Sequence, residues 1–387
     1  MSERKRILAV DVGTGTQDVL LFDSERSIEN CFAMVMPSPT VIVQRRILRA
    51  TAEGRPVLLS GHIMGGGPCA WAARDHAQAG YPCYATPDAA RTLDDDLSMV
   101  EALGIQVVDD EEAQRIHERH GASLVAITMR DFDADALRAV FQTFDIEPEV
   151  DAVAVAAFDH GAAPPGVSDR RFRFDAIVAR VRERPDPLAF AWRAADLPAD
   201  LTRLAAVAAD AARYAVDESP PAVVVMDTGA AALAGALEDP AVRQRDEALV
   251  ANLGNFHTLA FHLRGGRIVS LFEHHTGELD QPRLEGYLRD LAAGTLTNER
   301  VFAESGHGAL ILDPTRTHAN TATPFLAVTG PRRELLRGSA LAPYEPAPHG
   351  AMMLAGCYGL LRAVAALESD MAPAIVGVLG ASESPAS

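Results

Sequence analysis

Residue types that can hold a phosphate and a divalent cation follow one another near the N-terminus. An apolar run ends at Asp11, and Gly13, Thr14, Gly15 and Thr16 come before the next apolar run. Glycines let the backbone approach a ligand closely, while threonine hydroxyls and backbone N–H groups can donate to an anion. A carboxylate repels a phosphate unless a cation such as Mg²⁺ lies between them. The segment therefore predicts a magnesium nucleotide site, with an ordinary hairpin turn as the alternative.

A second glycine turn between apolar runs lies far along the chain. Residues 248–253 and 258–263 predict two strands, and Gly254 and Asn255 lie in the turn between them. This repeats the arrangement of the first segment, so we expect two similar hairpins that face one another across a cleft. A third turn, which contains Gly330, follows another short apolar run.

Two aspartates follow predicted strands at positions where a general base could lie. Asp227 ends an apolar run and precedes a helix of small residues at 230–237, and Asp159 ends another run beside His160. A positioned carboxylate that takes a proton from an acceptor hydroxyl contributes roughly 10²- to 10⁴-fold to a rate. Asp227 is the preferred base and Asp159 the second candidate. The alternative for Asp227 is a cap of the helix that follows it.

Histidines and arginines form a second group of candidate ligands. His160, His274 and His275 lie beside predicted strand ends, and Arg171 and Arg173 belong to an arginine-rich stretch. Guanidinium groups bind carboxylates or phosphates with two parallel hydrogen bonds, and imidazoles can bind a metal or carry a proton. We assign these five residues to substrate binding, with solvated or hydrogen-bonded side chains as the alternative. Adjacent residues of a strand point to opposite faces, so His274 and His275 could not both bind one metal without a turn between them.

The elements expected to position these residues alternate between strands and helices. Between residues 57 and 158, short apolar runs alternate with helical patterns, which is typical of a largely parallel sheet covered by helices. Residues 161–198 contain several glycines, prolines and arginines and predict a long loop or an insertion. The small residues of the helix at 230–237 would let two helices approach closely beneath the cleft.

The composition indicates a protein large enough for more than one domain. The chain has 387 residues, a formal net charge of −18 and 48% hydrophobic residues. This charge repels nucleic acid and anionic membranes. No apolar run approaches the roughly 20 residues that span a bilayer, so we expect a cytoplasmic protein. The four cysteines are scattered without a CxxC grouping, which disfavours an iron–sulfur cluster or a structural zinc site.

In their order along the chain, these motifs resemble those of the actin, sugar kinase and seventy-kilodalton heat-shock chaperone superfamily. Residues 11–18 are similar to its first phosphate motif, 248–263 to the second, 325–332 to the adenosine motif and 224–237 to the connecting helix. The resemblance implies an α/β protein in which two ribonuclease-H-like domains, the actin-like ATPase fold, flank a nucleotide cleft. The implied parts are a first domain at 1–240 with an α/β insertion at about 55–150, a second domain at 241–368 and a flexible tail at 369–387.

The same resemblance implies ATP and Mg²⁺ as cofactors, with Asp11 as the metal ligand. Asn252 stands where the superfamily usually has an aspartate, and Pro331 where it has a second glycine. We therefore expect an ATP-binding protein that acts as a phosphotransferase on a small polar metabolite or as an ATPase. One alternative is an ATP-gated activator or chaperone of a partner enzyme, and another is a histidine-dependent, metal-binding hydrolase without nucleotide turnover. The chain could form a homodimer.

A narrower resemblance covers residues 7–365 and concerns a family labelled "putative pyruvate formate-lyase activating enzyme". It rests on short stretches such as His62–Pro68, Asp159–Gly161, Ser168–Phe174 and Gly306–Gly308. A radical enzyme of that kind needs three closely spaced cysteines for its cluster, and the cysteines of this chain lack that spacing. We therefore do not expect the chemistry that the label names.

Overall fold

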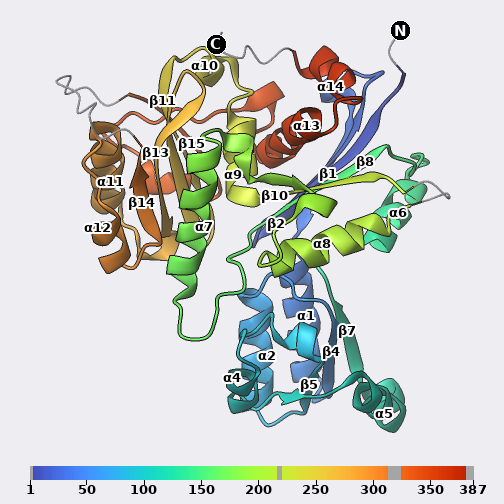
Figure 1. Cartoon of the computed structure of the whole chain (residues 1–387). Coiled ribbons are helices and arrows are strands. Elements are labelled where there is room, and N and C mark those ends of the chain that lie inside the picture. The colour runs from blue at the N-terminus through green and yellow to red at the C-terminus, as the bar shows by residue number, and fades with distance from the viewer. Residues whose placement is uncertain (1–2, 216–219, 313–323, 381–387) are drawn as a thin grey trace.

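Three β-sheets, with helices between and around them, make up a mixed α/β fold (Figure 1). The computed structural model describes residues 3–215, 220–312 and 324–380. Six strands form the first sheet, five the second and four the third. None of the helices in these ranges combines the length and the apolar character that crossing a membrane requires.

The first sheet contains the hairpin with Asp11. Its strand order is β3-β2-β1-β8-β10-β9. Strands β1, β2 and β3 are antiparallel neighbours, β8 and β10 run parallel to β1, and β9 is antiparallel to β10. Every residue of β1 and β8 is buried, and this explains their apolar sequences. The bounds are β1 Arg6–Val12, β2 Thr16–Asp23, β3 Phe32–Pro37, β8 Ala152–Ala157, β9 Ala191–Arg193 and β10 Ala222–Asp227.

The second sheet repeats this arrangement around the hairpin with Asn255. Its order is β14-β13-β12-β11-β15. Strands β11, β12 and β13 are antiparallel neighbours, and β15 runs parallel to β11 as β8 does to β1. Apolar residues of α11 pack on one face of this sheet. The bounds are β11 Glu247–Leu253, β12 His257–Arg264, β13 Arg267–His275, β14 Gly308–Ile311, β15 Phe325–Thr329, α11 Gln281–Ala293 and α12 Asn298–Ala303.

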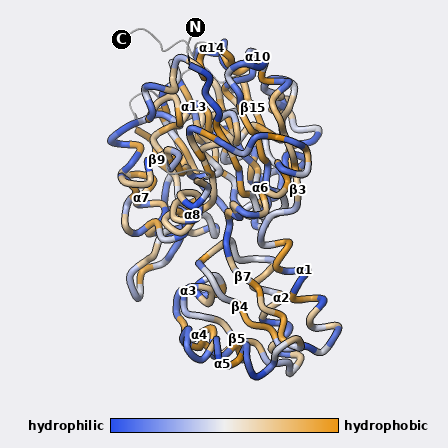
Figure 2. The backbone as a smooth tube through the Cα atoms, turned by 90° about the vertical axis from the view of Figure 1, so that its right-hand side faces the viewer, coloured by the Kyte–Doolittle hydropathy of each residue, from blue (hydrophilic) through white to orange (hydrophobic). Residues whose placement is uncertain are grey.

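The third sheet has a hydrophobic core of its own and forms a separate lower body in Figure 2. Its four strands, in the order β6-β5-β4-β7, are all parallel. Its core runs from Val43 to Met129, whereas α6 packs in the core of the first sheet. The parallel sheet expected from the alternation between residues 57 and 158 is therefore present in β4 to β7, but its last expected strand, β8, pairs with β1 in the first sheet. The bounds are α1 Pro39–Ala52, β4 Val57–Gly61, α2 Pro68–Gln78, β5 Cys83–Ala85, α3 Pro87–Ala90, α4 Leu97–Ala102, β6 Gln106–Val107, α5 Asp110–His120, β7 Val125–Met129 and α6 Ala134–Thr143.

Two helices, α9 (Thr228–Ala236) and α13 (Ala355–Leu367), touch through their backbones. A Cβ atom added at Gly235 would overlap the carbonyl group of Ala355, and one added at Gly359 would overlap that of Ala231. Figure 1 shows both helices between the first and the second sheet. The close approach predicted for the small-residue helix is confirmed.

Two segments differ from the expectation. The stretch 161–198, expected as a loop, contains α7 (Asp169–Glu183), which buries Phe174, Ile177 and Val181 on one face. The segment expected as a flexible tail contains α14 (Ala372–Leu379), whose Ile375 and Leu379 are buried. Residues 381–387 of that tail lie outside the described residues. The remaining helices are α8 Thr202–Ala212 and α10 Pro240–Arg243.

A buried ion pair next to the two touching helices gives a prediction about acid stability. Glu238 follows α9, and its two carboxylate oxygens accept hydrogen bonds of 2.8 and 2.6 Å from Arg362 of α13. Burial by itself would raise the pKa of Glu238, but His349 and Arg362 outweigh it and hold the pKa below the usual 4.5. A carboxyl group with a lowered pKa stabilises the fold above its unfolded pKa, and this stability is lost as the pH falls through the folded pKa.

We expect Glu238→Gln to lower the free energy of unfolding by about 3 kcal/mol at pH 7, because Arg362 loses its buried partner. The difference from the wild type should shrink below pH 4.5, where Glu238 becomes protonated. Urea unfolding at pH 7 and pH 3 measures both values. Glu118→Gln, on the exposed side of α5, is the control and should leave the free energy of unfolding unchanged at both pH values. A loss of equal size at both pH values would contradict the ion-pair explanation.

Candidate functional site

A cavity of about 430 Å³ lies between the two hairpin turns; residues of the first and second sheets line it, together with loop and helix residues around the third sheet such as Met64 and Thr92. Most of the predicted site residues line it, namely Asp11, Gly13, Thr14, Gly15, Thr16, Asp159, His160, Arg173, Asp227, Gly254, Asn255 and Gly330. Arg171, His274 and His275 are not among its lining residues. The structure thus brings the two hairpins and both candidate bases together at one place.

The two hairpin turns have the same backbone hydrogen bond. Gly13 N–H donates to the carbonyl of Thr16 at 2.9 Å, and Gly254 N–H donates to the carbonyl of His257 at 3.0 Å. A Cβ atom added at Gly15 would lie 3.0 Å from Nδ2 of Asn255, so the two turns nearly touch. The expectation that the hairpins face one another agrees with this contact.

Gly330 has a structural reason to be glycine. Its φ is +96°, and a Cβ atom there would lie 2.5 Å from the carbonyl oxygen of Leu253 and 2.6 Å from Oδ1 of Asn252. Only glycine fits this close approach of the turn after β15 to the end of β11. Gly330 lines the cavity, which agrees with the prediction that it faces adenosine. The close packing explains the glycine equally well.

Asp11 is a buried carboxylate on the cavity wall. Its Oδ1 accepts a hydrogen bond of 2.6 Å from the hydroxyl of Thr228, the first residue of α9. Burial raises the pKa of Asp11 to about 7, against the opposing effect of Thr228 and with a further rise from Asp227. A Cβ atom at Gly356 of α13 would overlap the Asp11 side chain. The first turns of α9 and α13 thus enclose the carboxylate. Its negative charge lowers the stability of the fold there unless a cation is bound.

Asp18 is a site residue that the sequence reasoning missed. It pairs directly with Asp11 across the β1–β2 ladder, lines the same cavity and is 8% exposed. Burial, and next the neighbouring Asp11, raise the pKa of Asp18 to about 8, and no described residue makes a hydrogen bond to its Oδ1. Two like charges this close favour a cation between them. Counting outward from the turn along both predicted strands would have revealed the pair.

Arg173 is the centre of a buried ionic network. Its guanidinium donates to both oxygens of Glu273, to Oδ2 of Asp227 at 2.9 Å and to the carbonyl of Asp159 at 2.7 Å. It also lies over the ring of Phe158, 3.9 Å from the ring centre. Arg173 lines the cavity, but its donors already have partners, so its part in substrate binding stays a prediction.

The two candidate bases also have structural partners. Asp227 caps α9, since its Oδ1 accepts from Ala230 N–H at 3.2 Å while Oδ2 accepts from Arg173. Asp159 accepts from the backbone N–H groups of Gly161 and Leu204, each at 2.8 Å. The helix cap given as the alternative for Asp227 is therefore present. A catalytic role of either residue stays a prediction.

Arg171, His160 and His274 have contacts that do not point to a substrate. Arg171 lies over the ring of Phe302, 5.0 Å from its centre. His160 is half-exposed, and its Nε2 lies 3.3 Å from Oδ2 of Asp95 in the unit of the third sheet. His274 is buried between the carbonyl groups of His275 and Glu304. Their predicted substrate role gains no support from these contacts.

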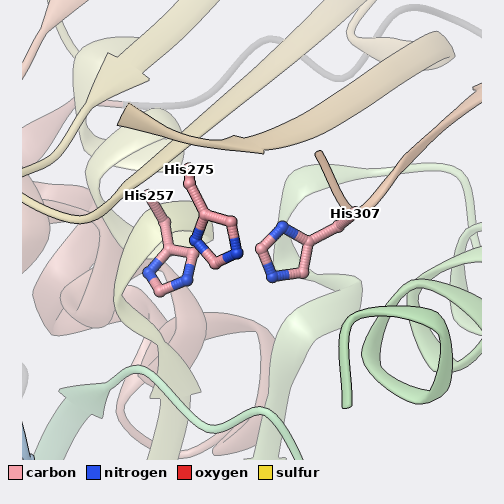
Figure 3. Close-up of side chains that lie close together, drawn as sticks. All are labelled: His257, His275 and His307. Carbon is pink, nitrogen blue, oxygen red and sulfur yellow. The ribbon is translucent and has the colours of Figure 1, made fainter. Parts of the chain in front are cut away.

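His275 points away from His274, as the alternation along a strand requires, and joins His257 and His307 (Figure 3). Ring centres of His275 and His307 lie 4.5 Å apart, and that of His257 lies 5.1 Å from each. His257 also stacks on Phe158, with ring centres 3.9 Å apart. Each of the three histidines comes from a strand end in the second sheet or just before one, so strand pairing brings them together.

The fold and the cavity define a mixed α/β protein whose candidate site lies between two glycine-containing hairpins. Residues 64–335 match the family described as "Putative pyruvate format-lyase activating enzyme (DUF1786)", and the chain belongs to that family. No curated protein sequence matches the chain significantly.

Solved structures show only remote likeness. The ethanolamine utilization protein EutJ from Carboxydothermus hydrogenoformans is 10% identical, with a TM-score of 0.29 over 93% of this chain and 89% of its own. A carbohydrate kinase from Novosphingobium aromaticivorans is 12% identical, with a TM-score of 0.22 over 96% and 88%. The PPX-GPPA enzyme of Aquifex aeolicus is 8% identical, with a TM-score of 0.20 over 78% and 61%. Likeness at this level transfers no activity to the chain.

Proposed function

We propose that the chain binds ATP with Mg²⁺ in the cavity between the two hairpins. One observation carries the proposal: two glycine turns, from sheets with the same strand arrangement, meet at a cavity that contains the buried pair Asp11 and Asp18. We further propose that each of these sheets is the centre of a ribonuclease-H-like domain, at residues 1–240 and 241–368. The third sheet, with its core between Val43 and Met129, would be an insertion in the first domain.

In this proposal the two turns hold the phosphate groups from opposite sides. Backbone N–H groups at Thr14 and Gly15 and at Asn255 would donate to phosphate oxygens, while those of Gly13 and Gly254 keep their hydrogen bonds within the turns. A Mg²⁺ ion bound by Asp11, with Asp18 opposite, would reduce the repulsion between the carboxylates and the phosphates, because hard cations prefer oxygen ligands. Gly330, at the cavity wall formed by the end of β15, would face the adenosine.

The simplest test of the proposal is nucleotide binding by the wild-type protein. We expect MgATP, and not ATP with a chelator, to raise the free energy of unfolding by about 2.7 kcal/mol at a concentration of 100 times Kd. Thermal shift and isothermal titration calorimetry measure the two effects independently. A flat response to MgATP in both measurements would refute the proposal.

For chemistry, we propose phosphoryl transfer to a small polar acceptor, or hydrolysis of ATP, with Asp227 as the base and Asp159 as the second candidate. A second cavity, of about 320 Å³, shares Asp227, Asp159 and Arg173 with the first and offers a place for the acceptor. Its other lining residues include Trp192 and Glu183, which would suit an acceptor with apolar and charged parts.

Asp227→Asn is expected to lower turnover by roughly 10²- to 10⁴-fold while MgATP affinity stays nearly unchanged. Asparagine keeps an oxygen that can cap α9 but cannot take a proton. Phosphate release and calorimetry separate the two quantities. Asp239→Asn is the matched control, because Asp239 is also buried and caps a helix, α10, without lining the cavity. An equal loss of MgATP affinity and turnover would indicate that Asp227 only caps α9.

The description of the family favours a second candidate function, an ATP-gated activator of a partner enzyme. Cys31, Cys69, Cys83 and Cys357 are free and buried, and no metal-binding group among the described residues contains a cysteine. A cysteine-bound cluster is thus not part of this proposal. Phosphate release that needs no small acceptor and rises when a partner protein is added would favour the activator over the phosphotransferase.

A further inference from the structure

We infer that His257, His275 and His307 form a binding site for a transition metal ion of the zinc class, beside the proposed nucleotide cavity (Figure 3). Each histidine offers one ring nitrogen, and these three nitrogens all lie within 4.8 Å of one another. In the described part of the chain, this is the one group of three or more His, Cys, Asp or Glu residues with such spacing. The inference does not depend on nucleotide binding.

The second sheet places the three residues by its hydrogen-bond register. His257 begins β12 and pairs directly with His275, the last residue of β13. His307 precedes β14, and its backbone N–H donates to the carbonyl of Glu273 at 3.0 Å, which fixes it beside the end of β13. Ligands on paired strands keep their relative positions, so the site is largely pre-formed.

The hydrogen bonding of His307 supports a bound ligand. His307 is 3% exposed, and no described residue makes a hydrogen bond to its Nδ1. An unpaired buried nitrogen in a group of three indicates a missing ligand.

The geometry requires a modest contraction around the ion. Zinc–nitrogen bonds of about 2.0–2.1 Å in a tetrahedral site bring the ligand nitrogens to roughly 3.4 Å from one another. From separations of up to 4.8 Å, side-chain rotations suffice, because the backbone pairing already aligns the residues. His275 has the most room to rotate, since it is half-exposed whereas His307 is buried.

The charges near the histidines are mixed. Arg173 and Arg170 are positive, and Arg173 contacts two carboxylates, Glu273 and Asp227. Glu273 Oε2 lies 3.9 Å from Nδ1 of His307 and makes no hydrogen bond to it, so a carboxylate lies beside the site while that nitrogen stays available for a metal ion.

The donor set selects the metal and leaves a place for a further ligand. Three imidazoles suit zinc, cobalt, nickel or iron, whereas Mg²⁺ prefers oxygen ligands, so this site differs from the one assigned to Asp11. Three protein ligands leave a fourth position of a tetrahedral zinc ion to water or to an anionic group. His257 lines the cavity, so such a group could belong to a molecule bound there.

The test uses the full-length protein without an affinity tag, stripped of metal by a chelator and titrated with Co²⁺ and Zn²⁺. We expect one Co²⁺ per chain with the visible absorption of nitrogen-bound, four-coordinate cobalt, and displacement of Co²⁺ by one equivalent of Zn²⁺. His275→Asn should lower the affinity for Co²⁺ by roughly 100-fold or more. Loss of a residue that only hydrogen-bonds to a metal ligand lowers metal affinity by roughly 10- to 100-fold. Asparagine at this half-exposed position should leave folding intact, which circular dichroism without metal verifies.

Two histidine variants serve as matched controls. His274→Gln changes the neighbouring residue of the same strand, whose side chain lies on the opposite face, and His117→Ala changes an exposed residue of α5. Both should bind Co²⁺ like the wild type. Absence of the cobalt absorption in the wild type, or an equal loss of affinity in His275→Asn and His274→Gln, would show that the three rings only pack together.

Discussion

Replacing Gly359 with alanine is expected to unfold most of the chain, although the change adds a single methyl group. The new Cβ atom would overlap the carbonyl group of Ala231 on the facing helix α9. Backbone atoms cannot avoid the overlap by a change of rotamer, so α9 and α13 would have to separate together with the strands they contact. We expect a loss of at least about 4 kcal/mol in the free energy of unfolding, measured by urea denaturation.

The same substitution at another helical glycine gives the control. Gly377 lies on α14, where no atom comes within 4 Å of an added Cβ. Gly377→Ala should leave stability unchanged or raise it by about 0.5–1 kcal/mol, because alanine favours the helix. Gly235→Ala, on the other side of the helix contact, should destabilise like Gly359→Ala. A loss below about 1 kcal/mol at Gly359 would mean that the two helices can separate at little cost.

The features that could be predicted from the sequence are those with local causes. The turn at Gly13–Thr16 follows from the glycines and hydroxyls of the turn itself, and the turn at Gly254 repeats it. The close approach of α9 to another helix followed from its run of alanines and glycines, although the partner, α13, could not be named. These features could be predicted because each depends on its own neighbourhood along the chain.

Other features depend on pairings that the sequence does not display. The helix α7 was missed because its buried face includes Arg173 beside the apolar residues, and an arginine in a core position breaks the hydrophobic pattern. Arg173 is buried because Glu273, a hundred residues away, pairs with it. The trio of His257, His275 and His307 likewise depends on the register of β12 with β13. Counting outward from the turn at Gly265 and Gly266 would have placed His257 opposite His274, because a β-bulge between His262 and Leu263 shifts the register by one residue.

Four acidic groups at the cavity, Asp11, Asp18, Asp227 and Glu273, differ in how the fold compensates their charge. Arg173 pairs with Asp227 and Glu273, whereas no described basic residue forms an ion pair with Asp11 or Asp18. A fold that buries two adjacent carboxylates without a cation loses stability, unless a ligand supplies the charge. This contrast supports Asp11 and Asp18, and not the network of Arg173, as the proposed place of a metal ion.

Asp11→Asn is therefore expected to make the nucleotide-free protein more stable at pH 8 and to reduce its response to MgATP strongly. Asparagine keeps the oxygen that accepts the hydrogen bond from Thr228 but carries no charge. The rise of the pKa of Asp11 from 3.8 to about 7 corresponds to a gain of at most about 4 kcal/mol for removing the buried charge. Loss of the metal ligand should weaken MgATP binding by roughly 100-fold, or about 2.7 kcal/mol.

The gain in stability without nucleotide and the loss of MgATP binding have opposite signs. Together they distinguish a metal ligand from a residue that only supports the fold. A purely structural Asp11 would give a variant that is less stable without nucleotide and still responds to MgATP. Thermal unfolding with and without MgATP, together with calorimetry, measures both effects on the same protein. Asp135→Asn, on the exposed surface of α6 and outside the cavity, is the matched control and should shift stability by less than about 0.5 kcal/mol in either condition.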